Sequence, residues 1–74
     1  MIRWNICIRS KDVKPFEKAV IVWECSGAKI VEVNELPNGN RRVELQGNDA
    51  AVAFYVGIAF QREVQRMEES NERN

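Results

Sequence analysis

The eleven residues from Ala50 to Phe60, AAVAFYVGIAF, contain no charged side chain. This run is too short to cross a bilayer, which takes about 20 apolar residues. It is also too apolar for an ordinary surface helix, which buries a single apolar stripe. The rest of the chain is therefore expected to fold around this segment and to cover most of it.

A helix over residues 49–68, drawn with about 100° per residue, divides this region into two stripes. The first is apolar along the whole helix and is predicted to face the core: Val52, Ala53, Val56, Phe60, Val64 and Met67. The second is apolar only in its first half: Ala51, Phe54, Tyr55, Ile58, Arg62 and Gln65. Because a domain of 74 residues has one core, the second stripe predicts contact with another chain. The alternative is that the first helix or the termini cover it.

Length and charge limit the possible classes of protein. The 74 residues suffice for one domain, predicted over 1–68, with a frayed polar tail at 69–74. Eleven basic and eleven acidic residues cancel. Residues 1–42 carry eight basic and five acidic groups, a net +3, and residues 43–74 carry three and six, a net −3. This mild asymmetry is far from the basic stripe that is typical of nucleic-acid binders.

The first strand and the first helix follow from two different periods. Residues 2–8 alternate strictly, with Ile2, Trp4, Ile6 and Ile8 on one side, as in a half-buried strand. Pro15 suits a first helical turn. Around and after it, apolar residues recur at spacings of three and four, which favours a helix ending before Gly27: Val13, Phe16, Ala19, Val20 and Trp23. That helix leaves Ile21 and Val22 off its core face. Residues 19–25 also have a strand-like composition, and a strand there would give a four-stranded sheet with one helix.

Residues 28–36 and 41–46 are predicted to form a hairpin. Pro37 and Asn38 suit the centre of a type I turn, and Gly39 suits the left-handed position that follows it in a three-residue loop. This register aligns the apolar side of both strands. It places Val33 opposite Val43, Val31 opposite Leu45, Glu35 opposite Arg41, and Glu32 opposite Glu44.

Gly47 and Asn48 end the hairpin, and Asn48 or Asp49 is expected to cap the second helix. The predicted order is therefore β-α-β-β-α. The expected fold is a single small α+β domain with a three-stranded antiparallel sheet and two helices on one face. This is the ferredoxin-like plan without its last strand. In that plan the strand at 2–8 keeps one open edge, which another strand can join.

The other face of the sheet is predicted to be exposed: Arg3, Asn5, Cys7, Arg9, Ile30, Glu32, Asn34, Arg42, Glu44 and Gln46. Arg3, Arg9 and Arg42 make RNA binding the alternative function. The face has no aromatic residue for base stacking, however, and it carries two carboxylates. Glu32 and Glu44 lie opposite each other, but without histidine or a third ligand they predict neither a metal site nor acid–base catalysis.

Cys7 and Cys25 show no C-x-x-C spacing, and no apolar signal sequence is expected because Arg3 and Asn5 interrupt the N-terminus. Free thiols in a reducing cytoplasm are the expected state, with a disulfide as the alternative. The glycines have no phosphate-binding spacing. Gly57, inside the second helix, is either a point of close approach for another backbone or neutral. No cofactor, metal or membrane contact is predicted.

These observations favour a non-enzymatic protein-binding module over an enzyme. The predicted contact residues are Ala51, Phe54, Tyr55, Ile58 and Arg62, with the edge of the strand at 2–8 as a second contact surface. A homodimer is expected as well, and a ligand-sensing dimer remains open. Small domains without catalytic residues often act as inhibitors, antitoxins or adaptors, including those of phages and mobile elements, which is an argument from analogy.

Overall fold

The predicted order of elements is confirmed. The computed structural model describes the backbone of residues 1–72 and the side chains of residues 1–69. Short 3-10 turns lie at Ser10–Asp12 and Glu24–Ser26. The main elements are β1 (Ile2–Ile8), α1 (Val13–Val22), β2 (Lys29–Glu35), β3 (Arg41–Gly47) and α2 (Ala51–Glu72).

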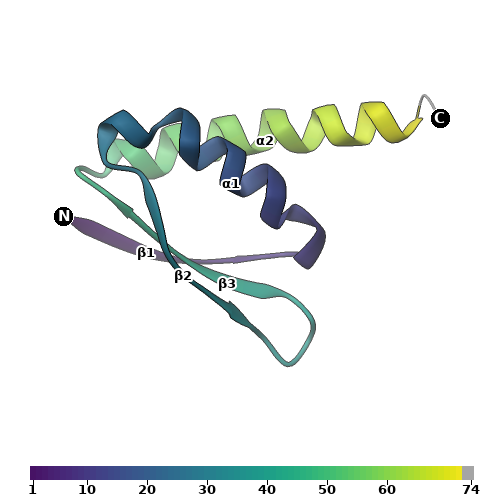
Figure 1. Ribbon diagram of the computed structural model, residues 1–74, viewed down its shortest axis with the longest axis horizontal. Helices are drawn as coiled ribbons and strands as arrows, with labels where there is room; N and C mark the ends of the chain where they lie inside the picture. Colours follow the sequence, from purple (N-terminus) through teal and green to yellow (C-terminus); the bar gives the residue numbers. More distant parts are fainter. Residues whose placement is uncertain (73–74) are drawn as a thin grey trace.

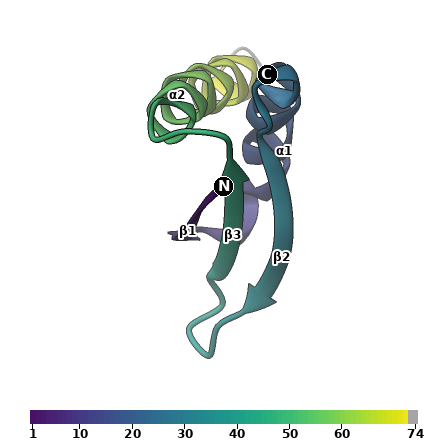
Figure 2. The same cartoon turned by 90° about the vertical axis from the view of Figure 1, so that its left-hand side faces the viewer.

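The fold has two layers, a three-stranded antiparallel sheet and two helices that both lie on one face of it (Figure 1). The strand order is β1-β3-β2, as the ferredoxin-like plan requires. Seen from the side, α1 lies above β2, and α2 lies toward the side of β1 and β3 (Figure 2). Within the described chain β1 and β2 each pair only with β3, so both are edge strands.

The core lies between these layers. Phe16 of α1 and Phe60 of α2 meet edge to face, with ring centroids 5.3 Å apart. The T-shaped contact is a favoured geometry for aromatic rings. The buried residues come from both helices, from the end of β1, from β3 and from the turn before β2: Ile8, Phe16, Ala19, Val20, Ala28, Val43, Leu45, Val52 and Val56.

Residues 13–22 form a helix, so the strand alternative for this region is wrong. The spacing of Phe16, Ala19 and Val20 places all three in the core, and this burial outweighs the strand preference of the β-branched residues that follow. Gly27 ends the segment with φ +83°, a left-handed conformation that favours glycine.

The three-residue hairpin loop is confirmed. The amide of Gly39 donates to the carbonyl of Leu36 at 3.0 Å, the Leu36 amide donates to the Asn40 carbonyl at 2.8 Å, and Gly39 has φ +86°. Three of the predicted cross-strand pairs follow from this loop: Val33 with Val43, Glu35 with Arg41, and Glu32 with Glu44.

The predicted pairing of Val31 with Leu45 is wrong, because β2 contains a bulge. Ile30 is opposite Leu45, and the register shifts between Ile30 and Glu32, which leaves Val31 as the extra residue. The bulge moves Ile30 from the predicted exposed face to the helix-covered face, where it packs against the core. Lys29 and Ile30 therefore have the opposite orientation from the one that a regular strand would give them.

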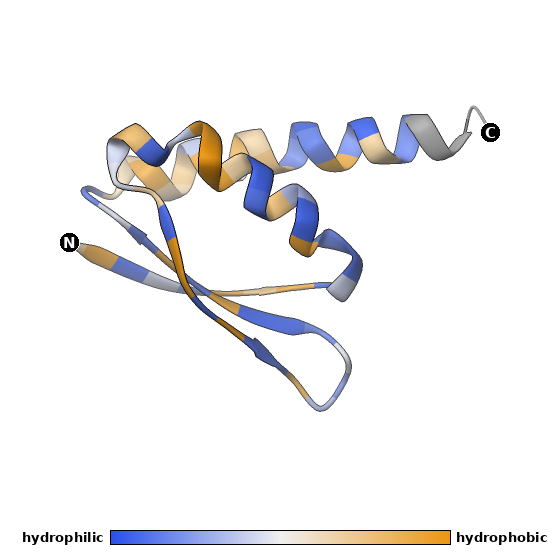
Figure 3. Ribbon diagram, viewed as in Figure 1, coloured by the Kyte–Doolittle hydropathy of each residue, from blue (hydrophilic) through white to orange (hydrophobic). Residues whose placement is uncertain are grey.

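Asp49 caps α2, because its carboxylate accepts the amide hydrogen of Ala51 at 2.9 Å. The helix continues to Glu72, past its predicted end at 68. The predicted tail at 69–74 includes residues 73–74, which lie outside the described residues. Apolar residues concentrate in the half of α2 beside α1, and polar residues predominate toward the far end (Figure 3).

The far part of α2 extends beyond the sheet (Figure 1), which corrects one predicted core position. Met67 belongs to the last turns of α2 and is 42% exposed. Val52 and Val56, at the other end of the same stripe, are 2% and 1% exposed. Neither helix within residues 1–72 combines the length and the apolarity that crossing a bilayer requires.

Candidate protein-binding site

The outward side of α2 presents the predicted contact residues. Phe54 is 68% exposed, Tyr55 42% and Ile58 40%, and Ala51 and Arg62 are exposed as well. They lie together because spacings of three and four residues return to the same side of a helix. The opposite side of α2 is used by Val52 and Val56, so the core does not need these residues.

Helix α1 contributes to the same surface. Trp23, just after α1, stacks on Tyr55 with ring centroids 4.7 Å apart and an angle of 18° between the ring planes. Val22 is 61% exposed and lines the same groove as Tyr55 and Ile58. We call Val22, Phe54, Tyr55 and Ile58 the helix patch.

Sequence reasoning missed the role of Val22. A clue was present, since the periodicity of α1 places Val22 off the core face. The sequence did not indicate that this exposed side of α1 faces α2. That arrangement depends on how the two helices cross, which is fixed by contacts such as that of Phe16 with Phe60.

A shallow groove of about 340 Å³ runs between the end of α1 and the middle of α2. Val22, Trp23 and Ile58 provide apolar lining, and Arg62, Glu63 and Arg66 provide a charged end. Glu63 and Arg66 are paired at 3.3 Å. The indole nitrogen of Trp23 is buried and has no hydrogen-bond partner within the described chain. The groove thus combines an apolar floor with a polar margin, as the core and rim of a protein interface do.

The residues of the nucleic-acid alternative lie apart from the helix patch. Arg3 lies 3.8 Å from Glu44, and Arg9 bonds to the buried carboxylate of Asp12 at 2.7 Å. Arg42 is exposed, and the structure gives it no ion pair within the described residues. Two of the three arginines therefore already face a carboxylate, which lowers the positive potential that a phosphate backbone would meet.

The structure shows both thiols as free and exposed, at Cys7 and Cys25. Within the residues it describes, no three histidine, cysteine or acidic side chains come together as a metal-binding group. Glu32 and Glu44 are paired in register as predicted, and Arg3 approaches Glu44. An added Cβ at Gly57 would have no neighbour within 4 Å, so this chain brings no close contact to that glycine.

The sequence matches no protein-family model and no curated protein. The basis for a function is therefore the surface that the fold creates.

Proposed function

We propose that this chain is a non-catalytic protein-binding module and that the helix patch is its contact surface. The observation that supports this is the clustering of exposed apolar side chains from two helices: Val22, Tyr55 and Ile58 line one groove, and Phe54 contacts Tyr55. Scattered exposed apolar residues are normal in monomeric proteins, but contiguous ones mark sites of interaction. Phe54 and Tyr55 also belong to the residue types that are enriched in interface cores.

A second copy of the chain is the first partner that we expect. A two-fold contact uses the same patch on both subunits, so an apolar patch can cover itself without a complementary surface elsewhere. A domain of this size buries a modest share of its surface on folding, and association adds apolar burial. Inhibitor, antitoxin or adaptor roles fit a module of this kind by analogy of size. The proposed location is the cytoplasm, where exposed thiols stay reduced.

Light scattering across a dilution series tests this proposal. The wild type is expected to shift from monomer to dimer as its concentration rises, and Ile58→Asp is expected to remain monomeric, because a buried carboxylate at the interface is costly. Ile21→Asp is the matched control. Ile21 is 65% exposed but lies on the other side of α1 and lines a different groove.

Three results are informative. Dimerisation that Ile58→Asp abolishes and Ile21→Asp preserves supports the helix patch. Dimerisation that survives Ile58→Asp would place the interface elsewhere, with the open edge of β1 as the next surface to alter. A wild type that is monomeric at every concentration would contradict self-association. The search would then move to a different protein, with Ile58→Asp as the control for specific capture.

A further inference from the structure

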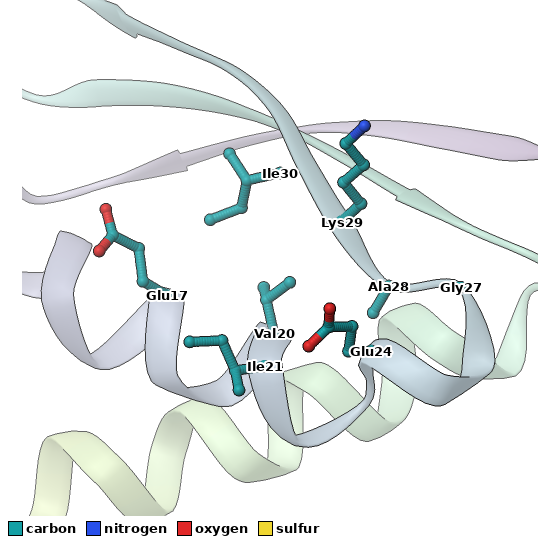
Figure 4. A pocket seen from close by; sticks show the side chains of 8 residues that line it. All are labelled: Glu17, Val20, Ile21, Glu24, Gly27, Ala28, Lys29 and Ile30. Atoms are coloured by element: carbon teal, nitrogen blue, oxygen red, sulfur yellow. The ribbon is translucent and has the colours of Figure 1, made fainter.

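A second and larger groove lies on the opposite side of α1, between that helix and the start of β2. Its volume is about 690 Å³. The floor is apolar and consists of Val20, Ile21, Ala28 and Ile30. Figure 4 shows these side chains between the helix and the strand, with Glu17 toward one end and Glu24 toward the other. The helix patch uses none of these residues.

The two carboxylates flank the apolar floor. Glu17 and Ile21, four residues apart, lie on the same side of α1, and Glu24 begins the 3-10 turn that follows the helix. Both are exposed, and neither has an ion-pair partner within the residues described. Lys29 also borders the groove, but its amino group points away from both carboxylates (Figure 4).

An unpaired sheet edge runs beside this groove. β2 pairs with β3 and with no other strand of the described chain, so one side of its backbone has free donors and acceptors. Such an edge is a template for an additional strand. The bulge at Val31 matters here because it turns Ile30 toward the groove. A segment lying along β2 would therefore meet α1 with every second side chain.

We propose that this groove binds an extended basic segment of another polypeptide, which adds to the edge of β2. An apolar side chain at the centre of the segment packs against Ile21 and Ile30. Lysine or arginine two residues before and after it pairs with Glu17 and Glu24. Same-face residues of a strand lie about 6.7 Å apart, so the two basic residues are about 13 Å apart, and their long side chains reach toward the two ends of the groove.

The charge of the groove selects this occupant over others of similar shape. An acidic segment would bring like charges against two carboxylates, which costs free energy in a partly dry site. An entirely apolar segment would cover both carboxylates without pairing them. The edge of β1 offers main-chain pairing too, but no residue of β1 lines either of the two grooves described above. This inference is independent of the helix patch and of self-association.

The test uses a synthetic heptapeptide, Thr-Lys-Thr-Val-Thr-Lys-Thr, whose two lysines and one valine share a face when it is extended. Titration into the full chain is followed by backbone amide NMR. We expect saturable shifts in β2 and α1, and weaker binding as salt rises. Replacing both peptide lysines with glutamate, or a central threonine with proline, is expected to weaken binding at least tenfold. Proline removes a donor from the added strand.

Protein variants complete the test. The double substitution Glu17→Gln with Glu24→Gln keeps side-chain shape and is expected to weaken binding at least tenfold, whereas Ile58→Asp is expected to bind the peptide as the wild type does. The proposal is overturned if the lysine peptide produces no saturable shifts at β2. It is equally overturned if the glutamate peptide or the double variant gives the same affinity. Circular dichroism confirms that each variant is folded.

Discussion

The indole of Trp23 lies almost parallel to the phenol ring of Tyr55, with their centroids 4.7 Å apart. This stack joins the end of α1 to the first half of α2. Tyr55 therefore has two roles. One face of its ring packs on Trp23 and stabilises the contact between α1 and α2, and the residue also forms part of the exposed helix patch. Phe54 contacts Tyr55 edge-on at 6.0 Å but is otherwise more open to solvent.

Substitutions at Tyr55 and Phe54 should therefore differ in their effect on the free energy of unfolding. Tyr55→Ala is expected to lower it by about 1–2 kcal/mol, because it removes a stacked pair and part of the helix contact. Phe54→Ala is expected to change it by less than about 0.5 kcal/mol. Urea denaturation of both variants at a concentration where the chain is monomeric provides the measurement. Equal losses would contradict the separate roles of these two residues.

Gly27 and Gly57 provide a second comparison, because an added methyl group would meet a close neighbour at Gly27 and open space at Gly57. Gly27→Ala forces a Cβ into a left-handed conformation at φ +83° and against the side chain of Asn48, so we expect a loss of about 1–2 kcal/mol. Gly57→Ala adds a methyl group that has no neighbour within 4 Å in this chain. It is expected to stabilise the fold by up to about 1 kcal/mol. Destabilisation by Gly57→Ala only at concentrations that favour dimers would show another backbone close to Gly57.

The bulge in β2 gives a prediction about neighbouring residues. Ile30→Ala is expected to lower the free energy of unfolding by about 2 kcal/mol, because Ile30 packs against the core. Val31→Ala is expected to cost less than about 1 kcal/mol, since Val31 is 41% exposed. A regular strand with Val31 opposite Leu45 would reverse this order. Thermal melts of the two variants distinguish the two registers.

The three arginines of the nucleic-acid alternative, Arg3, Arg9 and Arg42, are the basis of a fourth prediction. We expect no salt-sensitive binding of single-stranded RNA near physiological ionic strength, because Arg3 and Arg9 already face Glu44 and Asp12. Fluorescence anisotropy with a labelled oligonucleotide measures this directly. Saturable binding that falls with salt and with Arg3→Ala or Arg42→Ala would instead favour the nucleic-acid function.

Local rules were sufficient for much of the fold. The loop at residues 37–39 followed from the conformations that proline, asparagine and glycine favour, and it fixed the register of the adjoining part of the hairpin. The helix at Val13–Val22 followed from the spacing of its core residues. The bulge was not predictable in this way. The polar and apolar residues of β2 give no local signal for one extra residue, yet that residue reverses the faces of the sheet to which Lys29 and Ile30 belong.

The candidate site shows the same limit. The five predicted contact residues share the exposed side of α2 because one helix determines their directions. Val22 belongs to a different helix, and its place beside Ile58 depends on the crossing of α1 and α2. Met67 was expected in the core because its position in the repeat is correct. The periodicity of a helix predicts which side a residue lies on, but it does not predict how far the sheet extends along the helix.

Because the far part of α2 extends beyond the sheet, the local stability of this helix is expected to decrease toward its C-terminal end. Amides near Val56 are expected to open only when the helix leaves the core, whereas the amides of residues 68–72 depend on helical hydrogen bonds alone, which fray readily from an end. Hydrogen exchange should therefore accelerate progressively along one continuous helix. Any partner that packs against the far part of α2 would slow hydrogen exchange there without inducing a new helix or strand. Increased hydrogen-exchange protection of amides in the far half of α2 would therefore show that a partner covers this surface.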